Sequence, residues 1–533
     1  MHSEQDPDAA MGGAARPQLS RRSALRMIGT AGATALLSAD CLGQAGRPQY
    51  RNVVDGTRRG IASDGLRDES RALQAAIDSL SQAGGGELVL RSDAVTMATV
   101  GPLVREKVSL DLNGGTLLLR LSETNSTGVR LRSGATVRNG TIVVRSSGRP
   151  SLQGAVHAPV MVGPLYGEGG TPSQPSPDEG IGGWTIRDLA LVSDKNADAG
   201  GGTGIGAAAI SIMGGSHDGL IENIRVLDSP YMLGGIFMDW AMVGPIASAN
   251  DMNANKGAFL ARAAYTTHPH NIAVRNVRIG RMTRPLTSAG GSFGVRLSGV
   301  YNVDVSDVII QAATEAGYYH TAGDLGFEYA PEAIKPMACQ GIKISDMEVI
   351  DASVGYLTWT NSWADNVGRA VDKGYRPIID PIHPTDMLLQ NIRGAERSGS
   401  DANYGFRVDH QRGGSFVDCA AHGYRRGFYV DEQVDGVTLV RPISSNSAEH
   451  GISVEHPSRP PRNIRILNPV ARGNGRNPRG SPAGGILVGR SENVEIVGGH
   501  TPLDAVQKRG VWITRDARNA RTTGVPGTSV VKE

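Results

Sequence analysis

The sequence has little cysteine, few phenylalanines and no excess of charge of either sign. Its 54 Lys and Arg residues nearly balance 52 Asp and Glu residues, so the chain has no overall basic field that would attract nucleic acid. Only 7 Phe residues stand against 71 Gly residues, and this composition suits a solenoid with many turns. The apolar stretch at residues 27–39 is too short to form a transmembrane helix.

A short phrase recurs along the chain: a glycine, an apolar residue, any residue, a second apolar residue and a polar pair. Its clearest copies span residues 405–410, 427–432 and 451–456 and read GFRVDH, GFYVDE and GISVEH. Weaker copies start at Gly235, Gly294, Gly355, Gly485 and Gly510. Repetition at about 22 to 35 residues is typical of a solenoid, whose repeats must stack to bury their apolar sides.

A second phrase alternates with the first and places apolar residues at every other position before an Asn or Asp. Its copies end at Asp188, Asn223, Asn276, Asp307, Asp346, Asn391, Asp418 and Asn468. Alternation over four or five residues indicates half-buried strands, and a short polar side chain at the strand end tolerates the backbone angles of a tight turn. The sequence therefore predicts an all-β fold, a right-handed single-stranded parallel β-helix.

Two of the three cysteines, Cys339 and Cys419, lie within the repeats. They belong to turns of the solenoid that are about two apart, which is too far for a direct disulfide. We expect both as buried small apolar residues.

Four parts follow from these patterns. We expect a signal segment at 1–45, a linker and N-terminal cap at 46–107, one β-helix domain at 108–515 and a C-terminal tail at 516–533. Within the cap, apolar residues that share one helical face predict a helix near 69–82.

The N-terminal segment resembles a twin-arginine export signal, because Arg21 and Arg22 precede the apolar stretch 27–39. The resemblance implies contact with the twin-arginine export machinery and a periplasmic or extracellular location. Cleavage after Ala45 fits a small-residue site. Lipid anchoring through Cys41 is less favoured, because Asp40 does not fit the residues expected before a lipoprotein cysteine.

The phrase from Asp64 to Ile77, followed by the glycine run 84–86 and a Leu-Val-Leu strand, resembles the opening of the pectate-lyase/polygalacturonase-like superfamily. The resemblance implies that the helix caps the N-terminal end of a right-handed β-helix. It does not select a reaction, because that superfamily includes hydrolases, lyases, epimerases, fructotransferases and phage adhesins. The Asn-Thr-Asp, Asp-Asp, Gly-His-Gly and Arg-Ile-Lys motifs of polygalacturonases are missing here, so the usual galacturonan hydrolysis is not supported.

The first phrase also predicts the candidate site. If the apolar residues of 405–410 point inward, Arg407 and Asp409 point outward, and the same register places Asp431 and Glu455 outward on the next two turns. Turns stack at about 4.8 Å, so Asp409 and Asp431 would lie roughly 5 Å apart, a separation seen between the two carboxyls of glycosidases. The catalytic residues that we expect are Asp409, Asp431, Glu455, His410, Arg407 and Tyr429.

Other side chains are expected to bind substrate. They share either a matching position on another turn or an outward aromatic or charged side chain, and they are Asp239, Trp240, Trp359, Glu328, Glu432 and Arg425. Tyr318, Tyr319 and His320 are weaker candidates, because either Gly317 or Gly326 fits the start of their strand. His268 and His270 have no partner at ligand spacing, so we expect a loop turn there and no metal site.

The favoured function is a secreted polysaccharide-degrading enzyme, a glycoside hydrolase without cofactor that acts on a poly- or oligosaccharide. One alternative is a polysaccharide lyase on a uronic-acid polymer, in which the same carboxylates would hold Ca²⁺. Another is a non-catalytic glycan-binding adhesin, in which the carboxylates only solubilise an exposed strand. Long interruptions at 145–183, 241–270, 322–340 and 361–386 are expected to be loops, and those at 241–270 and 361–386 would wall a groove at the site.

Overall fold

The computed structural model describes residues 52–121, 127–146, 158–163, 180–195, 208–239, 241–243, 265–284, 291–322, 339–360, 385–397, 403–476, 483–526 and 530–533. The chain divides into two compact units, 1–49 and 50–533, and all described residues belong to the second. The predicted export signal, with Cys41 and Ala45, lies outside them. No helix in the described part is both long and apolar enough to cross a membrane.

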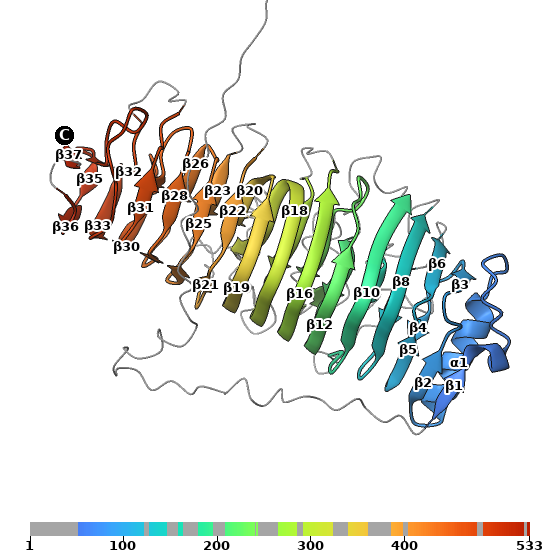
Figure 1. Cartoon of the computed structure of the whole chain (residues 1–533). Coiled ribbons are helices and arrows are strands. Elements are labelled where there is room, and N and C mark those ends of the chain that lie inside the picture. The colour runs from blue at the N-terminus through green and yellow to red at the C-terminus, as the bar shows by residue number, and fades with distance from the viewer. Residues whose placement is uncertain are drawn as a thin grey trace, which may run out of the picture. The chain divides into compact units, whose positions relative to one another are not determined.

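Parallel strands from successive turns lie side by side in chain order (Figure 1). They form three stacks, which are called here the first, second and third sheets. Because each strand pairs with the corresponding strand of the next turn, residues at one repeat position form a row along each sheet. This is the parallel β-helix that the two phrases predicted.

The first sheet contains the strands that precede the Asn or Asp of the second phrase. Its strands are β1 (Val53–Asp55), β2 (Gly86–Val89), β5 (Val108–Asp111), β21 (Leu388–Gln390), β24 (Ser415–Val417), β27 (Thr438–Val440), β30 (Arg462–Leu467), β33 (Ser491–Val497), β35 (Ala517–Arg518), β36 (Arg521–Thr523) and the first parts of the long strands β8 (Thr136–Ser146), β10 (Thr185–Lys195), β12 (His217–Val226), β16 (His270–Met282), β18 (Tyr301–Ala322) and β19 (Gln340–Ile350).

The second sheet follows the first around the coil, and the long strands continue into it. Its other strands are β3 (Val95–Ala98), β6 (Thr116–Leu121), β22 (Arg393–Ala395), β25 (Ala420–His422), β28 (Ile443–Ser445) and β31 (Val470–Arg472).

The third sheet contains the glycine phrases and therefore the candidate site. Its strands are β4 (Leu103–Val104), β7 (Val129–Leu131), β9 (Val160–Val162), β11 (Ala208–Met213), β13 (Gly234–Asp239), β17 (Phe293–Ser298), the end of β18, β20 (Ala352–Thr360), β23 (Tyr404–Val408), β26 (Arg426–Val430), β29 (Ile452–Val454), β32 (Ile486–Val488), β34 (Val511–Ile513) and β37 (Val530–Lys532). Two further strands, β14 (Ala241–Val243) and β15 (Tyr265–Thr267), form a separate antiparallel pair.

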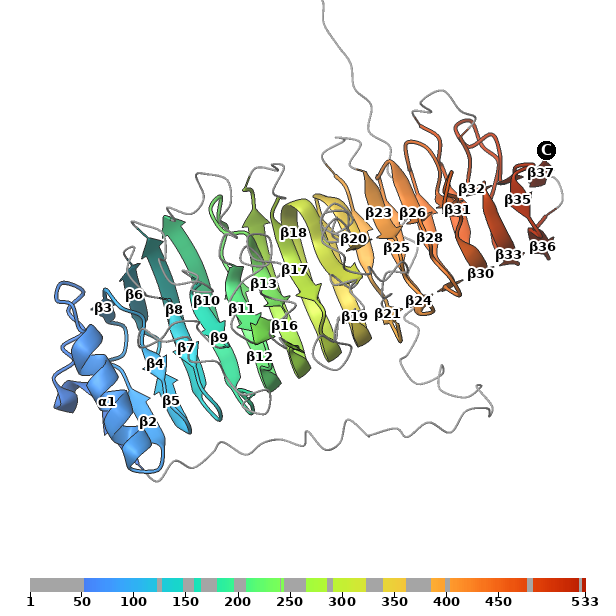
Figure 2. The ribbon, with the colours of Figure 1, turned by 180° about the vertical axis from the view of Figure 1, so that it is seen from behind.

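Helix α1 (Ser70–Gln82) confirms the predicted helix, and a short 3₁₀ helix spans Gly56–Arg59. Figure 2 shows α1 beside β2 and β4, at the end of the coil that is formed by its first turns. Leu73, Ile77 and Leu80 of α1 are buried and belong to the same hydrophobic cluster as the interior of the sheets. Burial of this one face explains why the apolar residues recur at helical spacing.

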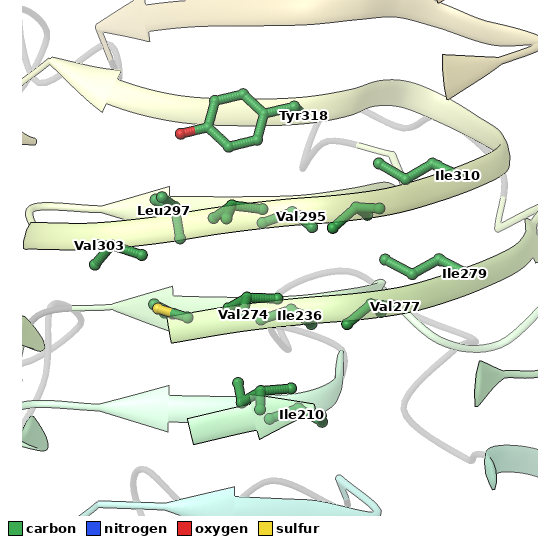
Figure 3. Packing of buried hydrophobic residues seen from close by; sticks show 14 of the residues in the cluster. Ile210, Ile236, Val274, Val277, Ile279, Val295, Leu297, Val303, Ile310 and Tyr318 are labelled. Atoms are coloured by element: carbon green, nitrogen blue, oxygen red, sulfur yellow. The ribbon is translucent and has the colours of Figure 1, made fainter. Parts of the chain in front are cut away.

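The interior consists of apolar rows that run from turn to turn. Ile210, Ile236 and Val295 pair in register with one another and then with Tyr318, and Figure 3 shows these side chains in line. Cys339 and Cys419 are both free thiols in the buried interior, as predicted.

The glycine that opens each first phrase permits close contact between turns. A Cβ added at Gly405 would lie 2.6 Å from the carbonyl oxygen of Gly427, and one at Gly427 would lie 2.6 Å from that of Gly451. A Cβ added at Gly451 would lie 2.7 Å from the carbonyl oxygen of Gly485. The repeat therefore requires glycine because any side chain there would strike the backbone of the next turn.

The Asn and Asp residues of the second phrase occupy the left-handed backbone region that the phrase predicted. All those named above have φ between 50° and 55°, where short polar side chains are tolerated. Their amides also bond between turns: Asn223 donates to Asp188 at 2.9 Å and Asn276 donates to Asn223 at 2.8 Å. These side-chain bonds join successive turns at the corner between the first and second sheets.

Candidate active site

The register of the third sheet places the predicted residues of neighbouring turns side by side. Phe406 pairs with Phe428, Arg407 with Tyr429, and Val408 with Val430. The Phe and Val residues are buried in the hydrophobic core, so Arg407 and Tyr429 lie on the outer face of the sheet, as alternation along a strand requires.

Arg407 joins the two predicted carboxylates. Its Nη2 lies 2.9 Å from Oδ2 of Asp431 and 3.2 Å from Oδ2 of Asp409, and its Nε donates to the same Oδ2 of Asp431 at 3.2 Å. The sequence predicted that Asp409 and Asp431 point outward from the coil, but it did not predict that they are covered: each is only 3% exposed. They lie outside the core but are covered, and alternation along the strand cannot show what covers an outward side chain.

His410 forms the next link of the network. Its Nδ1 lies 2.6 Å from Oδ1 of Asp409, and because an ionised carboxylate only accepts, Nδ1–H is the donor. His410 has a left-handed backbone, with φ of 53°, and its amide donates to the carbonyl of Glu432 at 2.8 Å. The turn directly after β23 thus brings the His410 ring against the carboxylate of Asp409. Both oxygens of Asp409 are therefore engaged within the protein.

Glu432 lies at the outer end of this network. Its Oε1 accepts from Arg459 at 2.8 Å and lies 3.8 Å from Nε2 of His410, while its Oε2 lies 3.9 Å from Nε2 of His456. The backbone amide of Arg459 donates to Nδ1 of His456 at 2.9 Å, so a neutral His456 carries its proton on Nε2, toward Glu432.

Asp431 differs from Asp409 in one respect. Its Oδ1 is buried and has no hydrogen-bond partner among the described residues. Burial raises the pKa of Asp431 above its usual value, Arg407 opposes that rise, and the neighbouring charge of Asp409 adds to it; a hydrogen bond from Tyr429 to the carboxylate also opposes the rise. Burial and then the nearby Asp431 also raise the pKa of Tyr429. Burial and the like charge of Asp409 thus push Asp431 toward the protonated form, and together they prevail over the opposite charge of Arg407.

Glu455 does not join the two aspartates. Its Oε1 lies 3.1 Å from Arg426, which also binds Glu449 at 3.0 Å. Arg425, predicted to bind substrate, binds Glu449 at 2.7 Å. Burial opposes the ionisation of Glu449, but its bonds from the two arginines prevail and lower its pKa. The expected row of three carboxylates is therefore divided between two arginines, because each arginine competes for the nearest acid.

The two turns at the site exchange a tyrosine and an arginine. Residues 404–409 read YGFRVD and residues 426–431 read RGFYVD, so Tyr404 pairs with Arg426 and Arg407 pairs with Tyr429. The two tyrosine rings stack with centroids 5.2 Å apart. Arg407 lies 5.6 Å from the Tyr404 ring and Arg426 lies 4.6 Å from the Tyr429 ring. These four residues are called here the Tyr–Arg square.

Three residues of the network also meet a geometric requirement for a metal site. Asp409, His410 and Glu432 offer ligand atoms that all lie within 4.8 Å of one another. Ca²⁺ takes oxygen ligands, so the imidazole does not suit it. Arg407 and Arg459 already bind the two carboxylates and would compete with any cation, so these ion pairs account for the cluster.

Other predicted site residues lie elsewhere or outside the described part. Asp239 ends β13, four strands before β23 in the third sheet, which is about 19 Å away at the usual strand spacing. Glu328, Trp240 and the side chain of Trp359 are not among the described residues. The same holds for most of the loops at 241–270 and 361–386, so the predicted groove is not tested.

The register of the segment after Gly317 is resolved. Val295 pairs with Tyr318, so Gly317 opens the phrase within β18, and Tyr318 and His320 lie in the interior. His320 is fully buried, and this burial lowers its pKa to about 3. Its Nε2 lies 3.1 Å from the Thr358 hydroxyl and 3.3 Å from that of Tyr356. His320 is thus a neutral residue of the interior and does not belong to the outer face that carries the site; Tyr356 and Thr358 connect it to Gln411, next to His410.

His268 precedes β16 and His270 opens that strand, so the expected loop turn does not include His270, and both side chains contact neighbouring turns. Nδ1 of His268 lies 2.6 Å from the carbonyl oxygen of Gly299, and the ring of His270 stacks on those of His217 and Tyr301.

Sequence reasoning missed Tyr404 and Arg426. Both stand directly before the glycine of a first phrase, one position outside the pattern that was used. The exchange of Tyr and Arg between YGFRVD and RGFYVD is the signal that could have identified them.

No family model matches the chain, and no curated protein matches it. Among solved structures it is similar to the A-module of a mannuronan C-5 epimerase of Azotobacter vinelandii, with 13% identity over 90% of this chain and 95% of that chain and a TM-score of 0.42. It is also similar to the catalytic unit of an α-1,3-glucanase of Streptomyces thermodiastaticus, with 11% identity, coverage of 90% and 70% and a TM-score of 0.43. A surface adhesin of Streptococcus pneumoniae matches with 11% identity, coverage of 90% and 92% and a TM-score of 0.44. At such values no activity carries over, and the chain's own residues must decide its function.

Proposed function

We propose that the chain is an exported carbohydrate-active enzyme that hydrolyses glycosidic bonds, with Asp431 as the proton donor. The observation that carries this proposal is that the two neighbouring carboxylates differ in their hydrogen-bond partners and in their pKa. Asp409 has both oxygens engaged, by Arg407 and His410, whereas Asp431 has a raised pKa and an oxygen without a described partner. Glycosidases use such a pair, one protonated and one ionised.

In this proposal Asp431 gives its proton to the leaving glycosidic oxygen, and Asp409 is the companion carboxylate. Both Oδ2 atoms lie within hydrogen-bond distance of one nitrogen of Arg407, so they are at most about 6 Å apart, below the range of about 6.5–9.5 Å in inverting enzymes. Asp409 then attacks the anomeric carbon, and water later releases the covalent glycosyl-enzyme. Because Oδ1 of Asp431 is buried, the substrate must displace the groups that cover it.

Product analysis tests the proposal. The full chain is incubated with a panel of glycans, new reducing ends are measured, and NMR of the fresh product reads its anomeric configuration. We expect hydrolysis with retention and loss of activity in Asp431→Asn. Inversion would contradict the role of Asp409, and an unsaturated product that absorbs in the ultraviolet would instead identify a lyase. Arg407 argues against a lyase, because it already pairs with two carboxylates and is not free to neutralise a uronate.

A non-catalytic glycan-binding protein is the second candidate. The burial of Asp409 and Asp431 favours it, because two covered carboxylates that share one arginine can also serve only to join neighbouring turns. In that case the chain binds glycan without turnover, and Asp431→Asn lowers stability while binding is kept.

A further inference from the structure

The Tyr–Arg square is an accessible part of the site. Tyr404, Arg407, Arg426 and Tyr429 all keep partial exposure, whereas Asp409 and Asp431 next to them are buried. A molecule that approaches this face therefore meets the two stacked rings and the two guanidinium groups before it reaches the carboxylates.

A second group of aromatic residues around an arginine lies earlier in the same sheet and provides an internal comparison. Arg296 lies 5.4 Å from the Phe237 ring, 5.9 Å from the Phe293 ring and 4.7 Å from the Tyr319 ring. Those three rings are at most 6% exposed, so they form a covered packing layer. Tyr404 packs against the outer apolar cluster of Ala316, Tyr319, Val354 and Leu357. Tyr404 and Tyr429 occupy the corresponding outer rows but, unlike those three rings, remain partly open to solvent.

Both arginines of the square already have acidic partners. Arg407 is paired with Asp409 and Asp431, and Arg426 is paired with Glu449 and Glu455. An anionic sugar would have to compete with these acids for the guanidinium groups and would face their negative charge. A neutral sugar meets no such repulsion: its apolar C–H face can pack on an aromatic ring, and its hydroxyls can accept from N–H groups of the arginines.

We propose that Tyr404 and Tyr429 form a stacking platform for a neutral sugar unit, and that Tyr404 is a substrate-binding residue beside Asp431. This inference rests on the proposed function for the role of Asp431, but the platform itself requires only binding. Arg407 lies over the Tyr404 ring and Arg426 over the Tyr429 ring, so these contacts hold the rings in place and little side-chain freedom remains to be lost when the sugar binds.

Binding to the full chain with Asp431→Asn, which cannot turn over in the proposed mechanism, tests the platform. The probes are the neutral hexaoses of cellulose, laminarin, amylose, mannan and xylan, and the anionic hexaoses of polygalacturonate and polymannuronate, titrated by calorimetry. We expect a neutral hexaose to bind and the uronates to bind at least about tenfold more weakly. Preference for a uronate, or no binding by any neutral hexaose, would overturn the proposal.

Added substitutions in the same background locate the binding. Tyr404→Leu should raise the Kd of the bound hexaose at least about tenfold, whereas Tyr404→Phe, which keeps the ring, should stay within about threefold. Tyr301→Leu is the matched control, since Tyr301 is also partly exposed and stacked, on His270 in the first sheet, and it should leave the Kd unchanged. An unchanged Kd in Tyr404→Leu would overturn the platform.

The two proposals fail in different ways. Binding that depends on Tyr404 without turnover by the wild-type chain would retain the platform and remove the hydrolase. Turnover that depends on Asp431 but not on Tyr404, in either kcat or KM, would do the reverse. Thermal unfolding of each variant, measured by circular dichroism, separates both results from loss of the fold.

Discussion

The ring of Phe406 lies flat on the ring of Phe428, with centroids 4.5 Å apart and planes that differ by 4°. Both rings are buried, and Phe416 of the first sheet meets Phe406 edge-on at 6.3 Å. Contact of this kind fixes the register of β23 against β26, and the same register places Asp409 and Asp431 on one arginine. The stability of the core and the geometry of the site are therefore linked.

Replacement of the inner ring should be costly. Phe428→Ala removes a fully buried side chain and leaves a cavity between Phe406 and Ile452, so the free energy of unfolding should fall by about 3–5 kcal/mol. Urea unfolding measures it, and Phe428→Leu, which fills most of the volume, should cost less. A nearly unchanged midpoint for Phe428→Ala would contradict the inward position of this ring.

The glycine contacts predict a second loss of stability. A Cβ at Gly427 would lie 2.0 Å from the Ser444 hydroxyl and 2.6 Å from the carbonyl oxygen of Gly451. Overpacking usually lowers the free energy of unfolding by about 1–3 kcal/mol, and Gly427→Ala should lower it by more, because part of the clash is with backbone. Gly413→Ala is the control, because a Cβ there meets no atom within 4 Å and only its left-handed backbone is strained, at a cost of about 1–2 kcal/mol. Equal losses would show that the turns are not closely packed.

The two aspartates should behave as one unit. Asp431→Asn and Asp409→Asn should each lower kcat by at least about 10²–10⁴ on a hydrolysed glycan, and the double variant should be little worse than either single variant. Steady-state rates of reducing-end release provide the measurement. Additive losses would mean that the residues act independently, and wild-type rates in both single variants would mean that the pair is structural.

The raised pKa of Asp431 predicts a pH dependence of stability. Above pH 3.8, its ordinary value, and up to its raised pKa, the folded chain keeps a proton that the unfolded chain releases. The unfolded state binds fewer protons there, so stability falls as pH rises through this window. Urea unfolding at several pH values should show this decrease in the wild type and less of it in Asp431→Asn.

Glu449 provides a comparison of opposite sign. Its pKa is lowered from 4.5, so its contribution to stability is present above that pH and is lost as pH falls. Glu449→Gln should therefore reduce the acid sensitivity of stability. If both variants changed the pH dependence of the unfolding free energy in the same direction, the raised pKa of Asp431 and the lowered pKa of Glu449 would be contradicted.

The rows of the coil could be predicted from the sequence because they depend on local rules. Apolar alternation identified the inward residues, such as Val408 and Val430, and the preference of Asn for left-handed angles identified the corners, such as Asn223. Each of these properties belongs to a few consecutive residues, and repetition makes the pattern visible.

The site could be predicted only in part because its contacts join different turns. The phrase brought Asp409 and Asp431 together, but it did not show that Glu455 would pair with Arg426 instead. Nor could alternation show that the aspartates are buried, since it states only the side of the strand to which a residue points. The interior position of His320 was also hidden, because a polar residue in a core row breaks the apolar pattern.

The exchange of Tyr404 and Arg407 with Arg426 and Tyr429 bears on how such a coil is inherited. A turn that arises by duplication initially stacks identical residues on one another, and here that would place arginine on arginine in neighbouring strands, where like charges destabilise the pair. The exchange removes this conflict and gives each arginine a ring as its neighbour on the next turn. Once the exchange is in place, reversal of either turn alone restores the repulsion, so each turn constrains the residues that the other can accept.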